Sequence, residues 1–258
     1  MIQFSKYHGA GNDFIIVDDR AGEFDTGDQK FIERLCHRRF GIGADGLMLL
    51  RSLEDCDFEM IYFNSDGRTS SMCGNGGRCI TSFAHRLNLA DKEVEFKAID
   101  GMHRARILTP ESISLEMNDV HGIETIGEGV FLNTGSPHVV LKVEDLEKLD
   151  LITEAHKIRY SERFRDGGVN VNFIELIDNS IQIRTYERGV EAETLACGTG
   201  VTAAAIACSF WEMISSNEVE VKAVGGDLSV RFEKTKTSFT NIWKTGPVEH
   251  VFDGEYNE

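Results

Sequence analysis

The pattern of apolar and polar residues along the chain predicts a mixed α and β protein. Short runs rich in β-branched or aromatic residues predict strands, and apolar residues spaced three and four apart predict helices. The clearest predicted strands are Phe14–Val17, Leu47–Leu50, Phe58–Phe63 and Val171–Leu176. The predicted helices are Gln29–Arg39, Gly77–Leu89, Val143–Ile158 and Gly200–Ile214. Because strands outnumber helices and do not alternate tightly with them, we expect an α+β fold with largely antiparallel sheet.

The chain also contains an internal repeat. Residues 93–107 (EVEFKAIDGMHRARI) and 218–232 (EVEVKAVGGDLSVRF) match at seven of fifteen positions, and each alternates around a glycine turn as a β-hairpin does. Before each hairpin come a strand, a polar loop and a cysteine-glycine motif at the start of a predicted helix. Two amphipathic hairpins can resemble each other by chance, but here order and spacing agree as well. We therefore predict two homologous, pseudo-two-fold-related lobes, residues 1–116 and 117–258.

Composition limits the classes of function. The 258 residues are 41% hydrophobic and 27% charged, and their number suits one large domain or two of moderate size. A formal net charge of −16 with no basic stripe argues against nucleic-acid binding. The N-terminus lacks the apolar core of a signal peptide, and no apolar run nears the roughly 18 residues of a membrane helix. We expect a cytoplasmic protein, without a membrane partner, whose six cysteines are reduced.

Two of the cysteines stand directly before glycine-rich helix starts. Cys73 precedes Gly-Asn-Gly-Gly, and Cys197 precedes Gly-Thr-Gly. Glycine lets the unpaired amides at a helix N-terminus approach a ligand, and the helix dipole favours an anion there. The same field lowers a cysteine pKa from about 8.5 toward neutrality. We therefore expect each lobe to supply a carboxylate cradle beside an activated thiol.

Cysteines also have other common roles in proteins. Free cysteine is commonly a small buried hydrophobe. That interpretation suits Cys36, Cys79 and Cys208, which lie in apolar helical patterns, whereas Cys56 lies in a polar loop with no evident role. Zinc-type cysteine spacing, a redox C-x-x-C and the phosphate-loop motifs are absent from the sequence. We expect no metal and no cofactor.

Two thiols brought to one cleft have a specific chemical use. Inverting a stereocentre at Cα requires one group that removes the proton and another, on the opposite face, that delivers one. A thiolate opposed to a thiol performs this in both directions. The helix N-termini then stabilise the charge that develops on the substrate carboxylate.

The motifs along the chain, taken together, resemble those of a known family. The segments KYHGAGNDFIIVD, GIGADG, FNSDG, MCGNGGRC, SPH, VNVNF, YERGVEAETLACGTG and GPVEHVFDG are together similar to the diaminopimelate epimerase family and span nearly the whole chain. The resemblance implies interconversion of LL- and meso-diaminopimelate for lysine and peptidoglycan synthesis, without pyridoxal phosphate. It implies two lobes, each a curled sheet around a central helix, with the active site in the cleft between them. It also implies that residues 246–258 return to the first lobe, and that the protein is a homodimer.

The resemblance assigns roles to individual residues. The implied acid/base thiols and the residues that assist them are Cys73, Cys197, His138 and Glu187. The residues implied to hold the substrate are Asn12, Asn64, Gly74, Asn75, Asn170, Glu187, Arg188, Gly198 and Thr199. The chain departs from the family pattern at Ser136, where asparagine is usual, and by one extra residue near Val190–Ala192. Both departures concern recognition of the distal end of the substrate.

Several of these residues have plainer interpretations when taken alone. His138 suits a structural histidine, Glu187 and Arg188 a solvated pair, and Asn64 and Asn170 turn positions. Two other functions also stay open. One is a racemase of the same fold that acts on proline or hydroxyproline, and the other is a non-enzymatic thiol module for redox sensing or metal binding.

Overall fold

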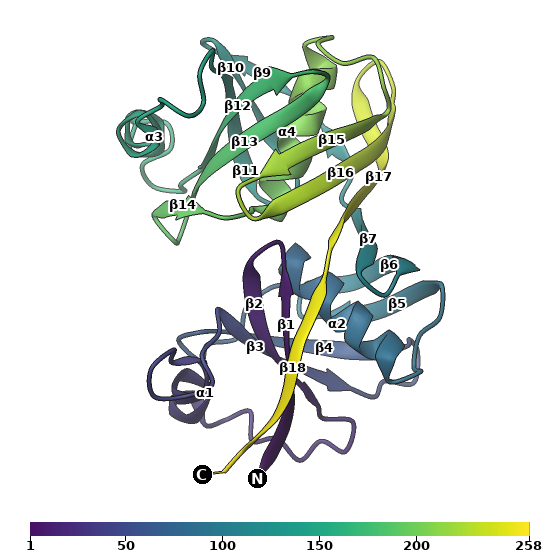
Figure 1. The fold of residues 1–258 in the computed structure, drawn as a ribbon. Helices are drawn as coiled ribbons and strands as arrows, with labels where there is room; N and C mark the ends of the chain where they lie inside the picture. Colours follow the sequence, from purple (N-terminus) through teal and green to yellow (C-terminus); the bar gives the residue numbers. More distant parts are fainter. Residues whose placement is uncertain (258) are drawn as a thin grey trace. The chain divides into compact units, whose positions relative to one another are not determined.

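The computed structural model describes residues 1–257, which form four helices and eighteen strands (Figure 1). The chain divides into two compact units, one of Met1–Leu115 with Gly246–Glu258 and the other of Glu116–Thr245. Glu258, which ends the predicted second lobe, lies outside the described residues. Among the described helices, none has both the length and the apolar character needed to cross a bilayer.

The first unit is a sheet with two helices. Neighbouring strands pair in the order β18-β1-β2-β3-β4-β5-β6-β7, and only β2–β3 and β4–β5 are parallel among the pairs described. The strands are β1 (Ile2–Gly9), β2 (Asn12–Asp18), β3 (Gly46–Arg51), β4 (Phe58–Asn64), β5 (Glu93–Ala98), β6 (Gly101–Thr109), β7 (Ser112–Met117) and β18 (Glu249–Tyr256). Helix α1 (Gln29–Cys36) joins β2 to β3, and α2 (Gly74–Arg86) joins β4 to β5.

The second unit has the same plan. Its strands are β8 (Val120–His121), β9 (Glu124–Ile126), β10 (Gly129–Asn133), β11 (Pro137–Lys142), β12 (Asn170–Ile177), β13 (Ser180–Glu187), β14 (Ala192–Thr194), β15 (Glu218–Ala223), β16 (Gly226–Lys234) and β17 (Ser238–Pro247). The parallel pairs are β11–β12 and β13–β15. They are joined through α3 (Leu151–Arg159) and α4 (Gly198–Phe210) respectively.

The predicted repeat is confirmed, and it extends well beyond the hairpins. The series β1-β2-β3-β4-β5-β6-β7 recurs as β10-β11-β12-β13-β15-β16-β17, with the same parallel and antiparallel pairs and equivalent helices. The hairpin registers coincide, because Glu93 pairs with Arg106 as Glu218 pairs with Arg231. Glycines at the turns, 101 and 226, take positive φ angles of 127° and 151°, which other residues rarely adopt.

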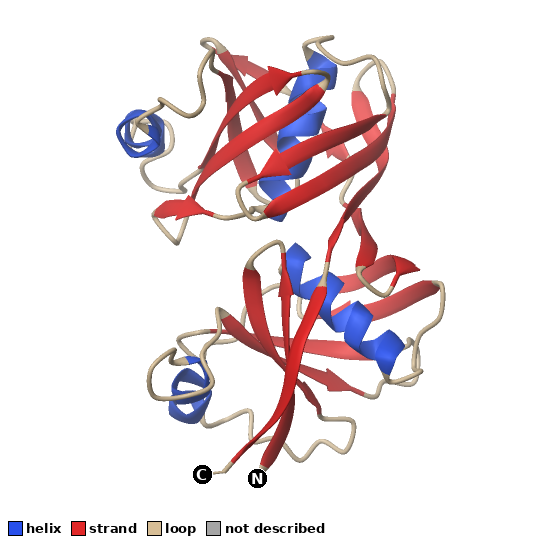
Figure 2. Cartoon of the chain, in the orientation of Figure 1, coloured by secondary structure: helices blue, strands red, loops and turns tan. Residues whose placement is uncertain are grey.

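Each unit contains one helix enclosed by its sheet. In α2 every residue from Asn75 to Ala84 is buried, and in α4 every residue from Gly200 to Ser209 is buried. Figure 2 shows each of these helices with the strands of its own unit around it, whereas α1 and α3 lie outside their sheets. A helix buried on all sides is part of the core rather than of the surface. The predicted α+β fold, with a central helix in each lobe, is confirmed.

Two predictions about the elements are wrong. The predicted helix Val143–Ile158 begins only at Leu151, where the Asp150 side chain accepts a hydrogen bond from the Thr153 amide. The residues before it continue from β11, because the Val143 amide donates to the carbonyl of Ile174. Strand–helix alternation, which the pattern did not indicate, is present in all four parallel pairs. Long irregular loops between strand and helix make this alternation hard to recognise in the sequence.

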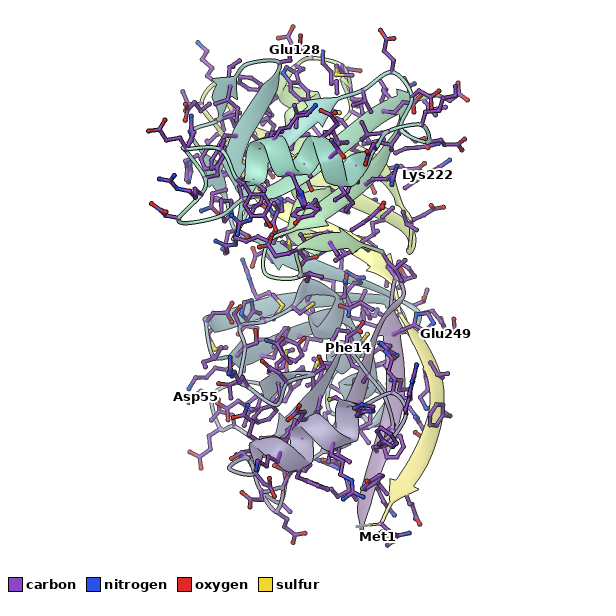
Figure 3. The ribbon with its side chains drawn as sticks, turned by 90° about the vertical axis from the view of Figure 1, so that its left-hand side faces the viewer. Met1, Phe14, Asp55, Glu128, Lys222 and Glu249 are labelled. Atoms are coloured by element: carbon purple, nitrogen blue, oxygen red, sulfur yellow. The ribbon has the colours of Figure 1, made fainter. Side chains whose placement is uncertain are left out.

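A core substitution tests the packing around α2. Phe14 on β2, labelled in Figure 3, is fully buried, and its ring packs near Gly76 and Tyr62. We expect Phe14→Ala to lower the free energy of unfolding by about 3–5 kcal/mol because it leaves a cavity. Phe40→Ala is the matched control, since that ring is 75% exposed, and we expect a change within about 0.5 kcal/mol. Urea unfolding measures both, and equal losses would contradict the enclosed-helix core.

Candidate active site

The predicted site residues of the first unit come together at one edge of its sheet. Asn12 begins β2 and Asn64 ends β4. Both lie beside the start of β3, because Gly46 pairs with Phe14 on one side and with Asn64 on the other. Asn64 is exposed and starts a turn, in which its carbonyl accepts from the Gly67 amide. Both the turn interpretation and a ligand contact are compatible with this position.

Cys73 is the N-cap residue of α2 and lies at the same edge. Its extended backbone (φ −89°, ψ 126°) turns the chain into the helix, and its Sγ lies 3.5 Å from Asn12 Oδ1. Asn75 Nδ2 donates to the same oxygen at 3.3 Å. Asn12 in turn donates to Asp45 Oδ2 at 2.6 Å. Asn12, Cys73 and Asn75 therefore form one hydrogen-bonded group, held in place by Asp45.

A buried arginine, Arg78, is hydrogen-bonded to this group and to the start of α2. Arg78 is fully buried, and its guanidinium donates to Asn75 Oδ1 at 3.0 Å and to the Gly74 carbonyl at 3.3 Å. Burial lowers its pKa. Sequence reasoning missed Arg78, although a charged residue one turn after Cys73, within an apolar helical pattern, was a visible signal. It holds the first turn of α2 in place through side-chain and main-chain contacts.

The second unit gathers its residues in the same way. His138 at the start of β11 pairs in parallel register with Asn170 at the start of β12. Asn170 Oδ1 accepts from the Arg188 amide at 2.8 Å, just beyond the end of β13. The hydroxyl of Ser136 lies 2.9 Å from Asn170 Nδ2 and 3.4 Å from Arg188 Nη2. Ser136, the departure from the family pattern, is thus part of the cluster that contains Asn170 and Arg188.

Cys197 is the N-cap residue of α4 and is almost completely buried, with 7% of its surface exposed. Burial, followed by the Glu187 carboxylate, raises the pKa of its thiol to about 12. Thr199, the nearby Gly200 amide and Lys244 act in the opposite direction. The predicted lowering of the cysteine pKa at the helix start is therefore wrong for Cys197. Desolvation outweighs the field of the helix.

Glu187, at the end of β13, is an ionisable neighbour of Cys197. Burial raises the pKa of its carboxyl group, and hydrogen bonding from Thr194 and from the Cys197 thiol partly opposes this. Thr194 Oγ1 donates to Glu187 Oε2 at 2.9 Å. Both groups therefore favour their protonated forms more than exposed groups of the same type do. Glu187 is half-buried and hydrogen-bonded to Thr194 and the Cys197 thiol, an environment unlike that of a solvated surface pair.

His138 is fully buried, and burial, helped by the charge of Arg188, lowers its pKa to about 3. The imidazole is therefore neutral at ordinary pH. Its Nε2 lies 2.9 Å from Thr199 Oγ1, and Thr199 Oγ1 lies 3.5 Å from Cys197 Sγ. His138 thus reaches the thiol through one hydroxyl group. It touches Cys197 only indirectly.

The extra residue near Val190–Ala192 anchors the turn after β13. Glu191 adopts a positive φ of 57°, and its carboxylate accepts from Arg159 at 2.8 Å and from the hydroxyls of Tyr160 and Tyr186 at 3.1 Å each. Arg159 and Tyr160 belong to the C-terminal end of α3. The turn that carries Arg188 is therefore fastened to α3.

The remaining cysteines behave as predicted. Cys36, Cys79 and Cys208 are buried, and burial raises the pKa of each thiol. Cys56 is half-buried in a loop. The first amides of a helix have no acceptor inside it. At the starts of α2 and α4 these include the amides of Gly74, Gly198 and Thr199.

Comparison with known proteins shows which family the chain resembles. The family model described as diaminopimelate epimerase matches residues 4–120 and 130–251. A diaminopimelate epimerase from Flavobacterium psychrophilum is 48% identical over 249 residues, which cover 96% of this chain and 97% of that protein. Another from Aquifex aeolicus is 38% identical over 279 residues, covering 100% of this chain and 98% of that protein.

Solved structures share the fold at low identity. A PhzF-family phenazine biosynthesis protein from Bacillus anthracis has a TM-score of 0.76 at 17% identity, covering 100% of this chain and 99% of that one. A hydroxyproline epimerase from Agrobacterium vitis, solved with bound trans-4-hydroxy-L-proline, has a TM-score of 0.67 at 13% identity, with 98% and 91% covered. At these identities the likeness establishes the fold alone.

The neutral His138 predicts a pH dependence of stability. Its pKa is about 3 in the folded protein, against 6.5 as its ordinary value, so the unfolded chain binds the proton first. Stability therefore falls as the pH drops below 6.5, by about 2 kcal/mol at about pH 5. We expect His138→Gln to lose less stability than the wild type between about pH 7.5 and about pH 5. Denaturant unfolding at both pH values measures the difference, and equal losses would show that His138 is not buried as a neutral group.

Proposed function

This chain belongs to the diaminopimelate epimerase family, and from that membership we propose that it interconverts LL- and meso-diaminopimelate with Cys73 and Cys197 as its acid/base pair. The observation that carries the proposal is the repeated placement of the two thiols. Each is the N-cap residue of the enclosed helix of its unit, followed by a glycine. An isomerase that must exchange a proton on both faces of one Cα needs two such groups.

The chemistry is a two-base transfer. In one direction a cysteine thiolate removes the Cα proton, and its sulfur becomes a thiol. The other cysteine, present as the thiol, delivers its proton to the opposite face of Cα and becomes a thiolate. The negative charge that develops spreads onto the substrate carboxylate, where backbone amides of Gly74, Asn75, Gly198 and Thr199 stabilise it. No cofactor is required, because thiols alone carry the proton.

Glu187 gives Cys197 a route to its reactive form. When Cys197 must act as a base, its S–H proton passes to the Glu187 carboxylate, which becomes the neutral acid. The raised pKa of Glu187 makes it a better acceptor than an exposed carboxylate. Thr199 then stabilises the thiolate by donating its hydroxyl hydrogen. His138 assists through Thr199, at 2.9 Å from its hydroxyl oxygen.

The polar residues around the two helix starts favour a substrate with two polar ends. Asn170 and Arg188 form a cluster with Ser136, and Asn12 and Asn64 lie at the sheet edge beside Cys73. We propose that these groups hold the distal amino and carboxylate groups of diaminopimelate. Proline and hydroxyproline have no second amino acid end that could bind to these side chains. We also propose a cytoplasmic protein, because reduced thiols need a reducing compartment. The resemblance to the family adds a homodimer to the proposal.

Activity measurements on single cysteine variants test the proposal. We expect Cys73→Ala and Cys197→Ala each to lower the rate of LL- to meso-diaminopimelate conversion by about 10²- to 10⁴-fold, because each removes one acid/base group. Binding of diaminopimelate should persist, as measured by calorimetry. Cys56→Ala, a half-buried thiol outside the site, is the matched control and should retain wild-type activity.

The rival functions predict different results. A proline-type racemase would epimerise proline or hydroxyproline and leave diaminopimelate unchanged. A non-enzymatic thiol module would show no turnover of either substrate, and both cysteine variants would match the wild type. Either result would overturn the proposal.

A further inference from the structure

Asn172 is a buried polar residue that the roles described so far do not use. It lies on β12, two residues after Asn170, and is fully buried. Its Nδ2 lies 3.0 Å from His138 Nδ1 and 3.0 Å from the Val139 carbonyl oxygen. Its Oδ1 accepts from the hydroxyl of Thr185 at 3.0 Å. Both the NH₂ group and the oxygen of the Asn172 side chain are therefore hydrogen-bonded.

These contacts determine which way the Asn172 amide faces. A main-chain carbonyl only accepts hydrogen bonds, so the NH₂ group of Asn172 must face Val139. That leaves the second hydrogen of Nδ2 directed at His138 Nδ1. Nδ1 is therefore the acceptor and carries no proton.

The proton of the neutral imidazole must then be on Nε2. From there it is donated to Thr199 Oγ1 at 2.9 Å. Asn170 Nδ2 lies 3.4 Å from Nε2 but does not compete, because its two hydrogens face Ser136 Oγ at 2.9 Å and the Pro137 carbonyl at 3.2 Å. Each hydrogen in the cluster has one acceptor.

Thr199 transmits this direction to the thiol. Because its oxygen already accepts from His138, its own hydrogen is free to point at Cys197 Sγ, 3.5 Å away. The main chain at this position is also held, since Thr134 Oγ1 donates to the Thr199 carbonyl at 2.8 Å. A hydroxyl that donates to sulfur stabilises the thiolate rather than the thiol.

We propose that Asn172 is a positioning residue for catalysis, because it holds His138 in the Nε2–H tautomer and so aims the Thr199 hydroxyl hydrogen at Cys197. This inference rests on the proposed function, in which the Cys197 thiolate is a reactive species. Asn172 touches neither the substrate nor the thiol. It acts through His138 and Thr199.

The packing of α4 is consistent with such a role. A Cβ atom at position 200 would lie 2.5 Å from Asn172 Oδ1 and 3.4 Å from Thr185 Oγ1. Gly200 therefore allows the first turn of α4 to lie directly against the Asn172 amide. The glycine after the Cys-Gly-Thr motif serves this close approach in addition to any exposure of backbone amides.

Other charged groups near the network are accounted for. The carboxylate of Glu187 on β13 and the ammonium group of Lys244 on β17 act on Cys197, and the guanidinium of Arg188 acts on His138. We expect these groups to keep their positions when Asn172 is changed, because they lie on β13, on β17 and in the turn after β13 rather than on β12. A variant at position 172 therefore alters the hydrogen-bond direction and leaves the surrounding charges in place.

The wild-type protein provides the first test. Two-bond ¹⁵N–¹H NMR correlations on histidine-labelled protein report which imidazole nitrogen carries the proton, and His138→Gln identifies the His138 signals. We expect a single Nε2–H tautomer near neutral pH. An Nδ1–H tautomer or an imidazolium would overturn the inference, even if no variant at position 172 folds.

Variants provide the second test. Alkylation of Cys197 by iodoacetamide, followed across pH by mass spectrometry, reports its thiolate without any substrate. We expect Asn172→Ala to slow this reaction about tenfold at a given pH and to shift its pH profile upward, because the thiolate loses a donated hydrogen bond. Unchanged alkylation in Asn172→Ala would overturn the inference.

Thr185→Val is the matched control. It also breaks a buried hydrogen bond to Asn172, but the Val139 carbonyl still fixes the amide, so the tautomer and the alkylation profile should stay as in the wild type. A profile shifted as far as that of Asn172→Ala would mean that any local damage has this effect, and would overturn the inference. Because neither readout uses diaminopimelate, an inactive wild-type enzyme would refute the proposed function without touching this result.

Discussion

Burial of α2 and α4 on all sides is the constraint from which the rest of the structure follows. An enclosed helix has only its two ends available for contact with a ligand, and the N-terminal end is the one whose free amides and dipole attract an anion. The sheet edges place Asn12 beside Cys73, and Asn170 beside His138 and Arg188. The proposed chemistry therefore belongs to the helix starts at a sheet edge, once in each unit.

The same burial disfavours the thiolate form of Cys197, and three neighbouring groups oppose that effect in part. Desolvation raises the pKa of its thiol to about 12, well above the value for a reactive cysteine. Thr199, the Gly200 amide and Lys244 partly oppose this shift, whereas the Glu187 carboxylate adds to it. The raised pKa keeps Cys197 mainly as a thiol near neutral pH, which is the form that the proposed mechanism requires when Cys197 acts as the acid.

Much of this could be predicted from the sequence, for identifiable reasons. Hairpin alternation and the spacing of Cys73 and Cys197 report local geometry, so the repeat and the helix starts were visible. The start of α3 was not, because Leu146 and Leu149 pack into the core from an irregular segment at helical spacing. The pKa of Cys197 depends on burial by distant strands, which no local pattern encodes. Asn172 gave one signal that was overlooked, because asparagines stand at two alternate positions, 170 and 172, of an otherwise apolar run.

The central claim is that each thiol serves one face of the same Cα, and hydrogen exchange with heavy water tests it most directly. Each single variant, Cys73→Ala or Cys197→Ala, retains one thiol, which can still exchange the Cα proton of the epimer that faces it. We expect deuterium to enter LL-diaminopimelate with one variant and the meso form with the other, and neither variant to invert the centre. If both variants exchanged the same epimer, or if one exchanged both at the wild-type rate, the two-thiol account would be contradicted.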